Sequence, residues 1–577
     1  MRSLLILLSV LALQLSATAA EPLKITVSKE TTYITEPLDE DGLPDYRRAW
    51  LERLRKRKVP AEQNGAVDYW QTVGLEMVDE KYRQAFCDEL GMPMPPEEGV
   101  LEMVDGAAMS RAMSIWYLRR KGYDVDEDSF DSFEQQNAAA AWEASFWPDA
   151  VDSYGATLSY PAAEVPPLKA WLEGNSNKLD RIVAALDNPG WYDPPHSLCG
   201  VSKDFSTDLG MRAFEWRGVF ASLETRARIN LDQGDVESTV RDLVAIRRLT
   251  EGRSADTWFD LLISTAGARL NAAPVELLLV EHSQASDHQL RKLQGLWSVD
   301  HSHAPLQSTL KGGERLYSLN YTLALLRKEP DTFDTLHLLL PLDDEGDEQL
   351  KWIEQALELP IDGDRLLRAV NQGFDRTHQA LDMGDTRQVL TILKERRTRL
   401  SNEPLPTRRA PELLSPAERA DAIVLLTSRS NLSSPDVILE AKTRTAAHSQ
   451  LMHLALALGR YRLAHGEYPE SLDALAPKYV ARIPVDAFGN DSFGYRRTDA
   501  GFLLYSFGLN GVDDGGSNND MGILAGYSAT GYSDQVRRLL GDEVPGKGLL
   551  EGYVPVQSDD IAIRLPLIEV PLPGEAE

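Results

Sequence analysis

The spacing of apolar residues predicts a chain that is helical through its middle and mixed at its end. From about residue 105 to residue 400, apolar side chains recur every three or four positions, as they do on one face of a helix. One such face is interrupted by Gln233-Gly234-Asp235 and then resumes. Glycine ends helices and aspartate begins them, so this stretch predicts a helical hairpin. The apolar positions of its first helix are Trp216, Phe220, Leu223, Ala227 and Leu231.

The turn of this hairpin occurs twice in the chain. The pattern Leu-Asp-x-Gly-Asp spans 231–235 and again 381–385. A helix–Gly-Asp–helix unit resembles one unit of a tetratricopeptide (TPR) array. The two copies are about 150 residues apart, which is not a tandem period. We therefore expect a mainly α-helical, irregular body with TPR-like hairpins.

The last part of the chain changes from helical to strand spacing. Apolar residues at helical spacing run from Ala446 to His465-Gly466, where glycine and a following Tyr-Pro turn end the helix. Strand-forming residues follow at 493–496 and at 502–506, with hairpin residues between them at 498–501. This order predicts an α+β domain with a small antiparallel sheet.

After Ser506 the side chains become glycine, asparagine and aspartate up to Gly516. The order of helix, Tyr468-Pro469 turn, Tyr-Arg-Arg strand and Gly/Asp loop resembles the globular domain of the major pseudopilins of type II secretion systems. The resemblance implies that this loop binds calcium. Carboxylates and backbone carbonyls around glycines are suitable ligands for a hard cation. The expected metal ligands are Asn510, Asp513, Asp514, Asp559 and Asp560.

Two segments could close this calcium loop. The nearer one, 518–522, carries a single carboxylate, Asp520, and no strand pattern follows it. Asp559 and Asp560 instead precede 561–565, which alternates as a strand does. We therefore expect closure at Asp559-Asp560, with 517–557 as an insertion. Asn510 stands where pseudopilins often carry aspartate, which implies weaker binding.

Runs of proline and serine mark the expected boundary of this domain. A fragment that begins near Asp436 is expected to fold alone, because its helix has its own sheet to cover. The predicted parts are a signal peptide at 1–20, an N-terminal segment packed on the body at 21–104, a helical domain at 105–400, a linker at 401–435 and the pseudopilin-like domain at 436–577.

The first twenty residues predict export. Arg2 precedes an apolar run at 4–15, and the small residues Ala17-Thr18-Ala19 form a cleavage pattern. The mature protein is expected in the periplasm or outside the cell, without a stable membrane anchor. The opening at 31–39 and the tail together also resemble exported proteins of planctomycete-type bacteria, a group that supplies an architecture and no reaction.

The charge of the chain limits its possible partners, and its two cysteines leave open whether a disulfide forms. The 577 residues carry a formal net charge of −29, which disfavours nucleic acid. A basic amphipathic helix, capped by Asp45 and extending past Leu54, could lie on an anionic membrane or meet carboxylates within the chain. Cys87 and Cys199 permit one disulfide or two thiols.

No catalytic motif stands out. His301-Ser302-His303 could supply two metal ligands, but a site normally needs three. The acidic run at 39–42 predicts a plain turn, and the run at 343–348 a solvated loop. We therefore expect a noncatalytic binding or scaffold protein with a protein partner in the cell envelope. The alternative is an envelope hydrolase that uses dispersed carboxylates such as Asp131 or Glu134.

Overall fold

The computed structural model describes most of the chain. The described residues are 23–103, 106–137, 165–200, 208–251, 256–258, 260–261, 267, 271–297, 304–329, 332, 336, 344–404, 406–428, 435–488, 492–513, 515–516 and 561–565. Several predicted features lie outside these residues. They are the signal peptide at 1–20, His301 and His303, Asp514, Asp520, the insertion at 517–557, Asp559 and Asp560.

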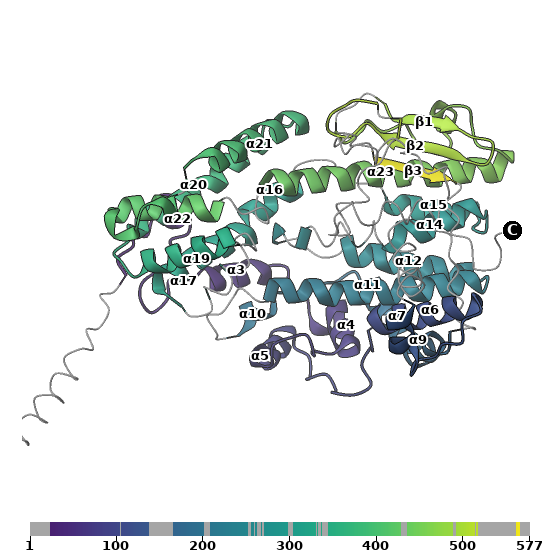
Figure 1. Cartoon of the computed structure of the whole chain (residues 1–577), viewed down its shortest axis with the longest axis horizontal. Coiled ribbons are helices and arrows are strands. Elements are labelled where there is room, and N and C mark those ends of the chain that lie inside the picture. The colour runs from purple at the N-terminus through teal and green to yellow at the C-terminus, as the bar shows by residue number, and fades with distance from the viewer. Residues whose placement is uncertain are drawn as a thin grey trace, which may run out of the picture.

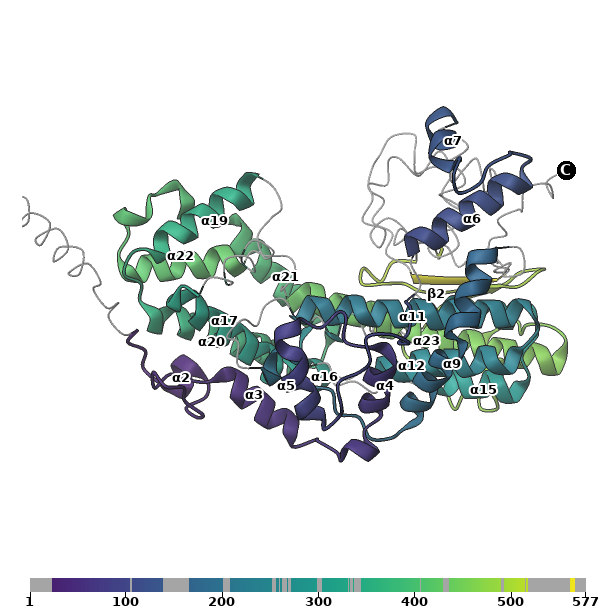
Figure 2. The same ribbon diagram turned by 90° about the horizontal axis from the view of Figure 1, so that it is seen from below.

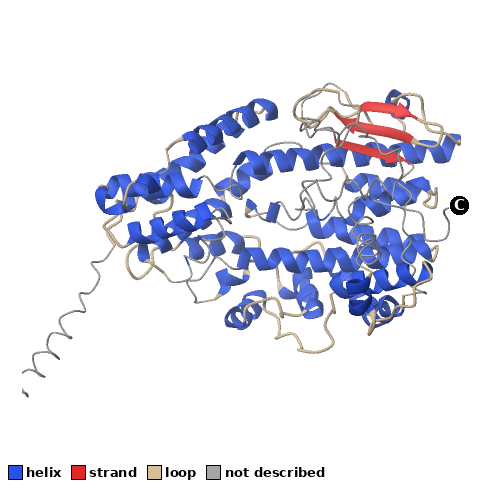
Figure 3. Ribbon diagram, in the orientation of Figure 1, coloured by secondary structure: helices blue, strands red, loops and turns tan. Residues whose placement is uncertain are grey.

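The structure is mainly helical, with a small antiparallel sheet near its C-terminal end, as the spacing predicts (Figure 3). The α-helices are α2 Lys29–Thr32, α3 Tyr46–Arg55, α4 Gly65–Val73, α5 Glu80–Leu90, α6 Gly106–Arg120, α7 Phe130–Gln136, α9 Pro166–Asp187, α10 His196–Cys199, α11 Asp208–Asp232, α12 Val236–Glu251, α14 Ala273–Glu281, α15 Asp287–Leu296, α16 Ala304–Lys311, α17 Gly313–Arg327, α19 Asp344–Leu357, α20 Gly363–Leu381, α21 Thr386–Asn402, α22 Pro416–Ser428 and α23 Pro435–His465. The strands are β1 Gly494–Arg497, β2 Phe502–Ser506 and β3 Ile561–Leu565.

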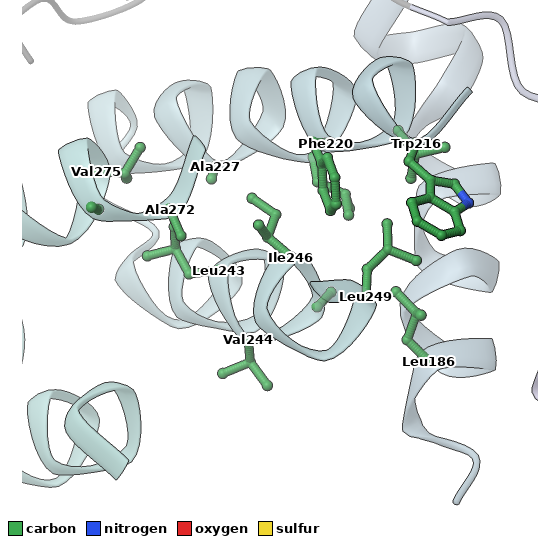
Figure 4. Close-up of a cluster of buried hydrophobic side chains, with 14 of the residues drawn as sticks. Leu186, Trp216, Phe220, Ala227, Leu243, Val244, Ile246, Leu249, Ala272 and Val275 are labelled. Atoms are coloured by element: carbon green, nitrogen blue, oxygen red, sulfur yellow. The ribbon is translucent and has the colours of Figure 1, made fainter. Parts of the chain in front are cut away.

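The hairpin predicted around Gly234 is confirmed as α11 and α12. Gly234 has φ +77°, a backbone conformation that glycine adopts without strain. Asp235 Oδ1 accepts a hydrogen bond of 3.0 Å from the Ser238 amide and so begins α12. The two helices pack through apolar side chains such as Phe220 and Ile246 (Figure 4), which form part of the main core.

The second copy of the turn forms the same structure between α20 and α21. Gly384 has φ +83°, and Asp385 Oδ1 accepts a hydrogen bond of 2.7 Å from the Gln388 amide. α20 also supports the N-terminal segment, because the Asn371 side chain donates hydrogen bonds to the carbonyls of Lys29 and Glu30 on α2. Residues 231–235 and 381–385 therefore specify two helical hairpins in one body.

Residues 24–27 alternate as a strand does and 31–34 are rich in strand-forming residues, but the structure has no strand there. Residues 24–27 form no regular element, and 29–32 form α2. Ser28 Oγ accepts a hydrogen bond of 3.2 Å from the Thr31 amide, and Thr32 Oγ1 donates one of 2.8 Å to the Ser28 carbonyl. These local side-chain bonds stabilise a helical turn in spite of the strand propensity of threonine.

The segment predicted as a linker, 401–435, contains α22. Ser415 Oγ accepts a hydrogen bond from the Glu418 amide at 3.2 Å, and Glu418 Oε2 accepts one from the Ser415 amide at 2.7 Å. This capping box and Pro416 at the first helical position make the Ser-Pro pair a helix start. α22 packs through Ile423 into a second apolar cluster with α19 and α20.

The acidic run at 343–348 also differs from its prediction. The run was expected to be a solvated loop, but α19 begins at Asp344 and continues through these acids. Acidic side chains in a first helical turn are stabilised by the free amide groups there. Asp39 does form the predicted plain turn, because its Oδ1 accepts hydrogen bonds of 3.0 Å from the amides of Asp41 and Leu43.

The sheet has the order β1-β2-β3 and both pairings are antiparallel. β2 and β3 occupy the predicted residues, and β1 begins one residue later than predicted. In the register, Ser506 pairs with Ile561 and Phe502 pairs with Leu565. The sheet lies along one side of α23, while α14 and α15 lie along the other side of the same helix (Figure 1).

The molecule is elongated, with the sheet near one end. α17, α19, α20 and α22 gather at the opposite end, as Figure 2 shows. α23 and α11 run between the two regions (Figure 1). The long helices therefore connect the sheet region to the rest of the body.

Candidate calcium loop and buried acidic groups

The predicted calcium loop begins where β2 ends. Ser506, the last residue of β2, is fully buried. Its Oγ donates a hydrogen bond of 2.7 Å to Asp486 Oδ2 and accepts one of 3.2 Å from the Gly508 amide. The first residues of the loop are thus fixed to a buried carboxylate.

Asp486 is connected in turn to α23. The Gln450 side chain of α23 donates a hydrogen bond of 2.6 Å to the Val485 carbonyl and accepts one of 2.9 Å from the Ala487 amide. Asp486 Oδ1 accepts a hydrogen bond of 3.2 Å from the Phe488 amide. Because Asp486 is only 2 % exposed, the hydrogen bonds of its own carboxylate form in the interior. Hydrogen bonds to Asp486 and to the two residues beside it therefore connect the loop base to α23.

Sequence reasoning missed Asp486 and Gln450. The available signal was a single acid in the otherwise apolar stretch 483–488. A buried carboxylate needs hydrogen-bond donors, which predicts a structural partner for Asp486 but does not identify Ser506 or Gln450.

Two of the five expected calcium ligands, Asn510 and Asp513, are described, and both lie in the loop. Asn510 Oδ1 accepts a hydrogen bond of 2.6 Å from the Val512 amide. Asp513 Oδ1 accepts hydrogen bonds of 2.9 Å from the Tyr505 hydroxyl and from the Gly515 amide. These contacts hold one oxygen of each side chain in place.

The remaining expected ligands are Asp514, Asp559 and Asp560, which lie outside the described residues. Within the part of the chain that is described, no three His, Cys, Asp or Glu side chains form a metal-binding group. Oxygen ligands in a glycine-rich loop suit calcium chemically, and Asn510 and Asp513 provide two such ligands in the described part of the loop.

The helical body contains two acids with raised pKa values. Glu276 on α14 is 0 % exposed, and burial raises its pKa to about 8 in spite of a hydrogen bond from Trp297. Glu314 on α17 is 8 % exposed, and burial raises its pKa to about 7, while the Trp258 amide bonded to it acts in the opposite direction. Both are held in the interior, away from solvent.

The carboxylates named for a hydrolase lie apart from these two. Asp131 on α7 is exposed and forms an ion pair of 2.6 Å with Arg111. Glu134 lies in the same helix, and its side chain is not among those that the structure describes. The described surroundings of Asp131 are those of a surface ion pair.

The basic helix α3 and the residues directly after it meet carboxylates of the chain itself. Arg55 and Lys58 contact Glu89 at 2.5 and 3.2 Å, and Arg57 contacts Asp256 at 3.1 Å. Burial alone would raise the pKa of Glu89, but the hydrogen bonds it accepts hold it below the ordinary value. These ion pairs favour the internal-carboxylate interpretation of the helix over a membrane contact.

The two cysteines are present as thiols. Cys87 is buried on α5, where burial raises the pKa of its thiol. Cys199 is partly buried at the end of α10, and its Sγ lies 3.7 Å from the Pro195 carbonyl oxygen. Of the two alternatives, the structure therefore has the free thiols.

No family model, curated protein or solved structure matches the chain. None of the helices in the described part combines the length and apolar character that a membrane span requires.

Proposed function

We propose that this chain is an exported, noncatalytic binding or scaffold protein of the cell envelope. Its TPR-like helical hairpins offer the surface for a protein partner. Its C-terminal, pseudopilin-like domain is stabilised by calcium bound in the loop after β2. The proposal rests on the order of α23, the hairpin β1–β2 and the Gly/Asp loop, and on the residues that fix that loop.

The register of β3 is the observation that carries the calcium site. Ile561 follows Asp559 and Asp560 in the chain and pairs with Ser506, the residue at which the loop begins. Consecutive Cα atoms are about 3.8 Å apart, so this pairing brings the chain next to the loop base directly after the two aspartates. It supports closure by Asp559-Asp560 over closure by Asp520.

An envelope hydrolase remains the alternative, because Glu276 and Glu314 have the raised pKa values typical of catalytic acids. Their burial favours a structural role, since a catalytic acid must reach its substrate. Activity that depends on either carboxyl group would favour the hydrolase.

Thermal unfolding of the full chain in calcium and in chelator tests the proposal. At calcium a hundredfold above the dissociation constant, we expect the free energy of unfolding to rise by about 2.7 kcal/mol. Asp560→Ala should abolish this gain and Asp520→Ala should keep it. Asp499→Ala, in the hairpin turn between β1 and β2, is the control that should also keep it.

Coincident unfolding curves with and without calcium would refute the metal site. Loss of the calcium effect in Asp520→Ala, but not in Asp560→Ala, would refute the closing segment. Export is tested by N-terminal sequencing of the native protein, which should begin at Ala20 or Glu21; an intact Met1 start would contradict it.

A further inference from the structure

Two basic residues of α21 are neutralised by carboxylates of α23. Lys394 Nζ lies 2.6 Å from Glu440 Oε2, and Arg397 Nε lies 3.0 Å from Asp436 Oδ2. The chain as a whole has 89 acidic and 60 basic side chains, so carboxylates are plentiful. A pair of arginines without a carboxylate partner therefore needs an explanation.

Arg396 on α21 and Arg376 on α20 form such a pair. Among the described residues, neither guanidinium makes a hydrogen bond or an ion pair. Asp375, next to Arg376 in the chain, contacts Arg315 at 2.9 Å instead. The acid that neighbours Arg376 in the sequence is thus engaged elsewhere.

The two guanidinium groups are close enough to affect each other. α20 and α21 pack as a hairpin, and Arg396 Nη2 is 3.9 Å from the position that a Cβ on Gly373 would take. Gly373 precedes Arg376 by three residues, so the two lie on the same face of α20. Burial, and then the charge of Arg376, lower the pKa of Arg396. Arg396 is half-buried and Arg376 is exposed, which leaves the pair open to a ligand from solvent.

We propose that Arg376 and Arg396 form a binding site for a phosphate group. Each guanidinium presents donors in a planar fork that fits an oxyanion. A phosphate carries a charge of about −1.5 to −2 at neutral pH, enough to neutralise both arginines, whereas one carboxylate neutralises only one. Free phosphate and a phosphate ester share this chemistry. The site lies on the α20–α21 hairpin and does not depend on the calcium loop.

Calorimetry and thermal unfolding of the full chain with inorganic phosphate test the site, with sodium chloride at matched ionic strength as the reference. We expect phosphate to bind and to raise the melting temperature, while chloride does not. Arg376→Gln and Arg396→Gln should each weaken phosphate binding at least about tenfold, because each removes one fork. Arg181→Gln changes an exposed arginine of α9 that has no ion-pair partner among the described residues, and it should leave binding unchanged.

A second measurement tests the pair without any ligand. In phosphate-free buffer of low ionic strength, Arg376→Gln should melt at a higher temperature than the wild type, because it removes the repulsion. Methyl phosphate in place of phosphate identifies the source: tighter binding indicates an ester and weaker binding indicates free phosphate. The proposal is overturned if phosphate acts no differently from chloride, if both Gln variants keep full binding, or if Arg376→Gln shows no gain in melting temperature.

Discussion

Glu276 is a carboxyl group enclosed by the helical core. Trp297 Nε1 donates a hydrogen bond to its Oε2, and its Oε1 has no hydrogen-bond partner in the described part of the chain. The Arg247 guanidinium carbon on α12 lies 4.1 Å from the centroid of the Trp297 ring, and the His448 ring on α23 lies at a steep angle to Trp297, with the two ring centroids 5.9 Å apart. Arg247 lowers the pKa of Glu276, but burial outweighs it and the pKa is about 8.

This raised pKa predicts a specific dependence of stability on pH. Between the ordinary pKa of 4.5 and about 8, the folded chain holds a proton at Glu276 that the unfolded chain has lost. The contribution of Glu276 to stability is therefore complete below 4.5, falls as pH rises, and levels off above about 8. The maximal slope for one proton is about 1.4 kcal/mol per pH unit.

Glu276→Gln keeps the shape and removes the titration, so it should gain stability relative to the wild type as pH rises through this window. Chemical denaturation of both proteins at pH 5, 6, 7 and 8 measures the difference. Glu237→Gln, at an exposed position of α12, is the control and should show a constant difference. A constant difference for Glu276→Gln as well would mean that Glu276 is charged in the folded chain.

Among the elements, those with short-range signals were predictable from the sequence. The turns at Gly234 and Gly384 and the strand-forming residues at 502–506 each depend on a few neighbouring residues, and the structure has them as predicted. α22 was missed because Ser415 and Pro416 serve equally as loop residues and as a helix start. A choice between the two requires the apolar cluster that α22 joins, which no local pattern shows.

The residues of the candidate calcium loop also divide into those that the sequence predicts and those that it does not. Asn510 and Asp513 were identifiable, because glycine and oxygen-bearing side chains follow a strand directly. The bonds of Ser506 to Asp486, and of Gln450 to the residues that flank Asp486, join positions 20 or more residues apart. Such pairings depend on how α23 and the sheet pack, so spacing along the chain does not reveal them.

Two glycines should respond in opposite directions to the same substitution. Gly174→Ala, within α9, meets no atom within 4 Å and should stabilise the fold by about 0.5–1 kcal/mol, because alanine favours a helix. Gly234→Ala also has open space, but its φ of +77° strains any other residue, and it should cost about 1–2 kcal/mol. Denaturant midpoints of the two variants measure both effects. Equal shifts would contradict the backbone conformation at Gly234.

At the scale of the whole molecule, α23 belongs to two parts of the fold at once. The sheet covers one side, and α14, α15 and α21 pack along the helix as well. Seven residues of this helix, from Leu451 to Leu458 with the exception of 453, are fully buried. A helix that is apolar all round is buried all round. The nearly continuous apolar run at 451–459 indicates this burial on all sides. The strand-forming residues that follow the helix indicate, in contrast, a helix that covers only a sheet.

The shared helix changes what is expected of a C-terminal fragment. Sequence reasoning predicts that a fragment from Asp436 folds alone, but separation from the body would expose the side of α23 that packs on Val280 and Leu290. We expect the fragment 436–577 to unfold without a cooperative transition or to aggregate, because several large apolar side chains would face water. Mixing it with the fragment 21–428 should restore a cooperative transition, since the complementary face of α14 and α15 is then present. Calorimetry of each fragment and of the mixture makes the measurement. If the isolated fragment melted cooperatively at the temperature of the full chain, the contacts of α23 with the body would contribute nothing to its stability, and the sheet with its own helix would be an independent domain.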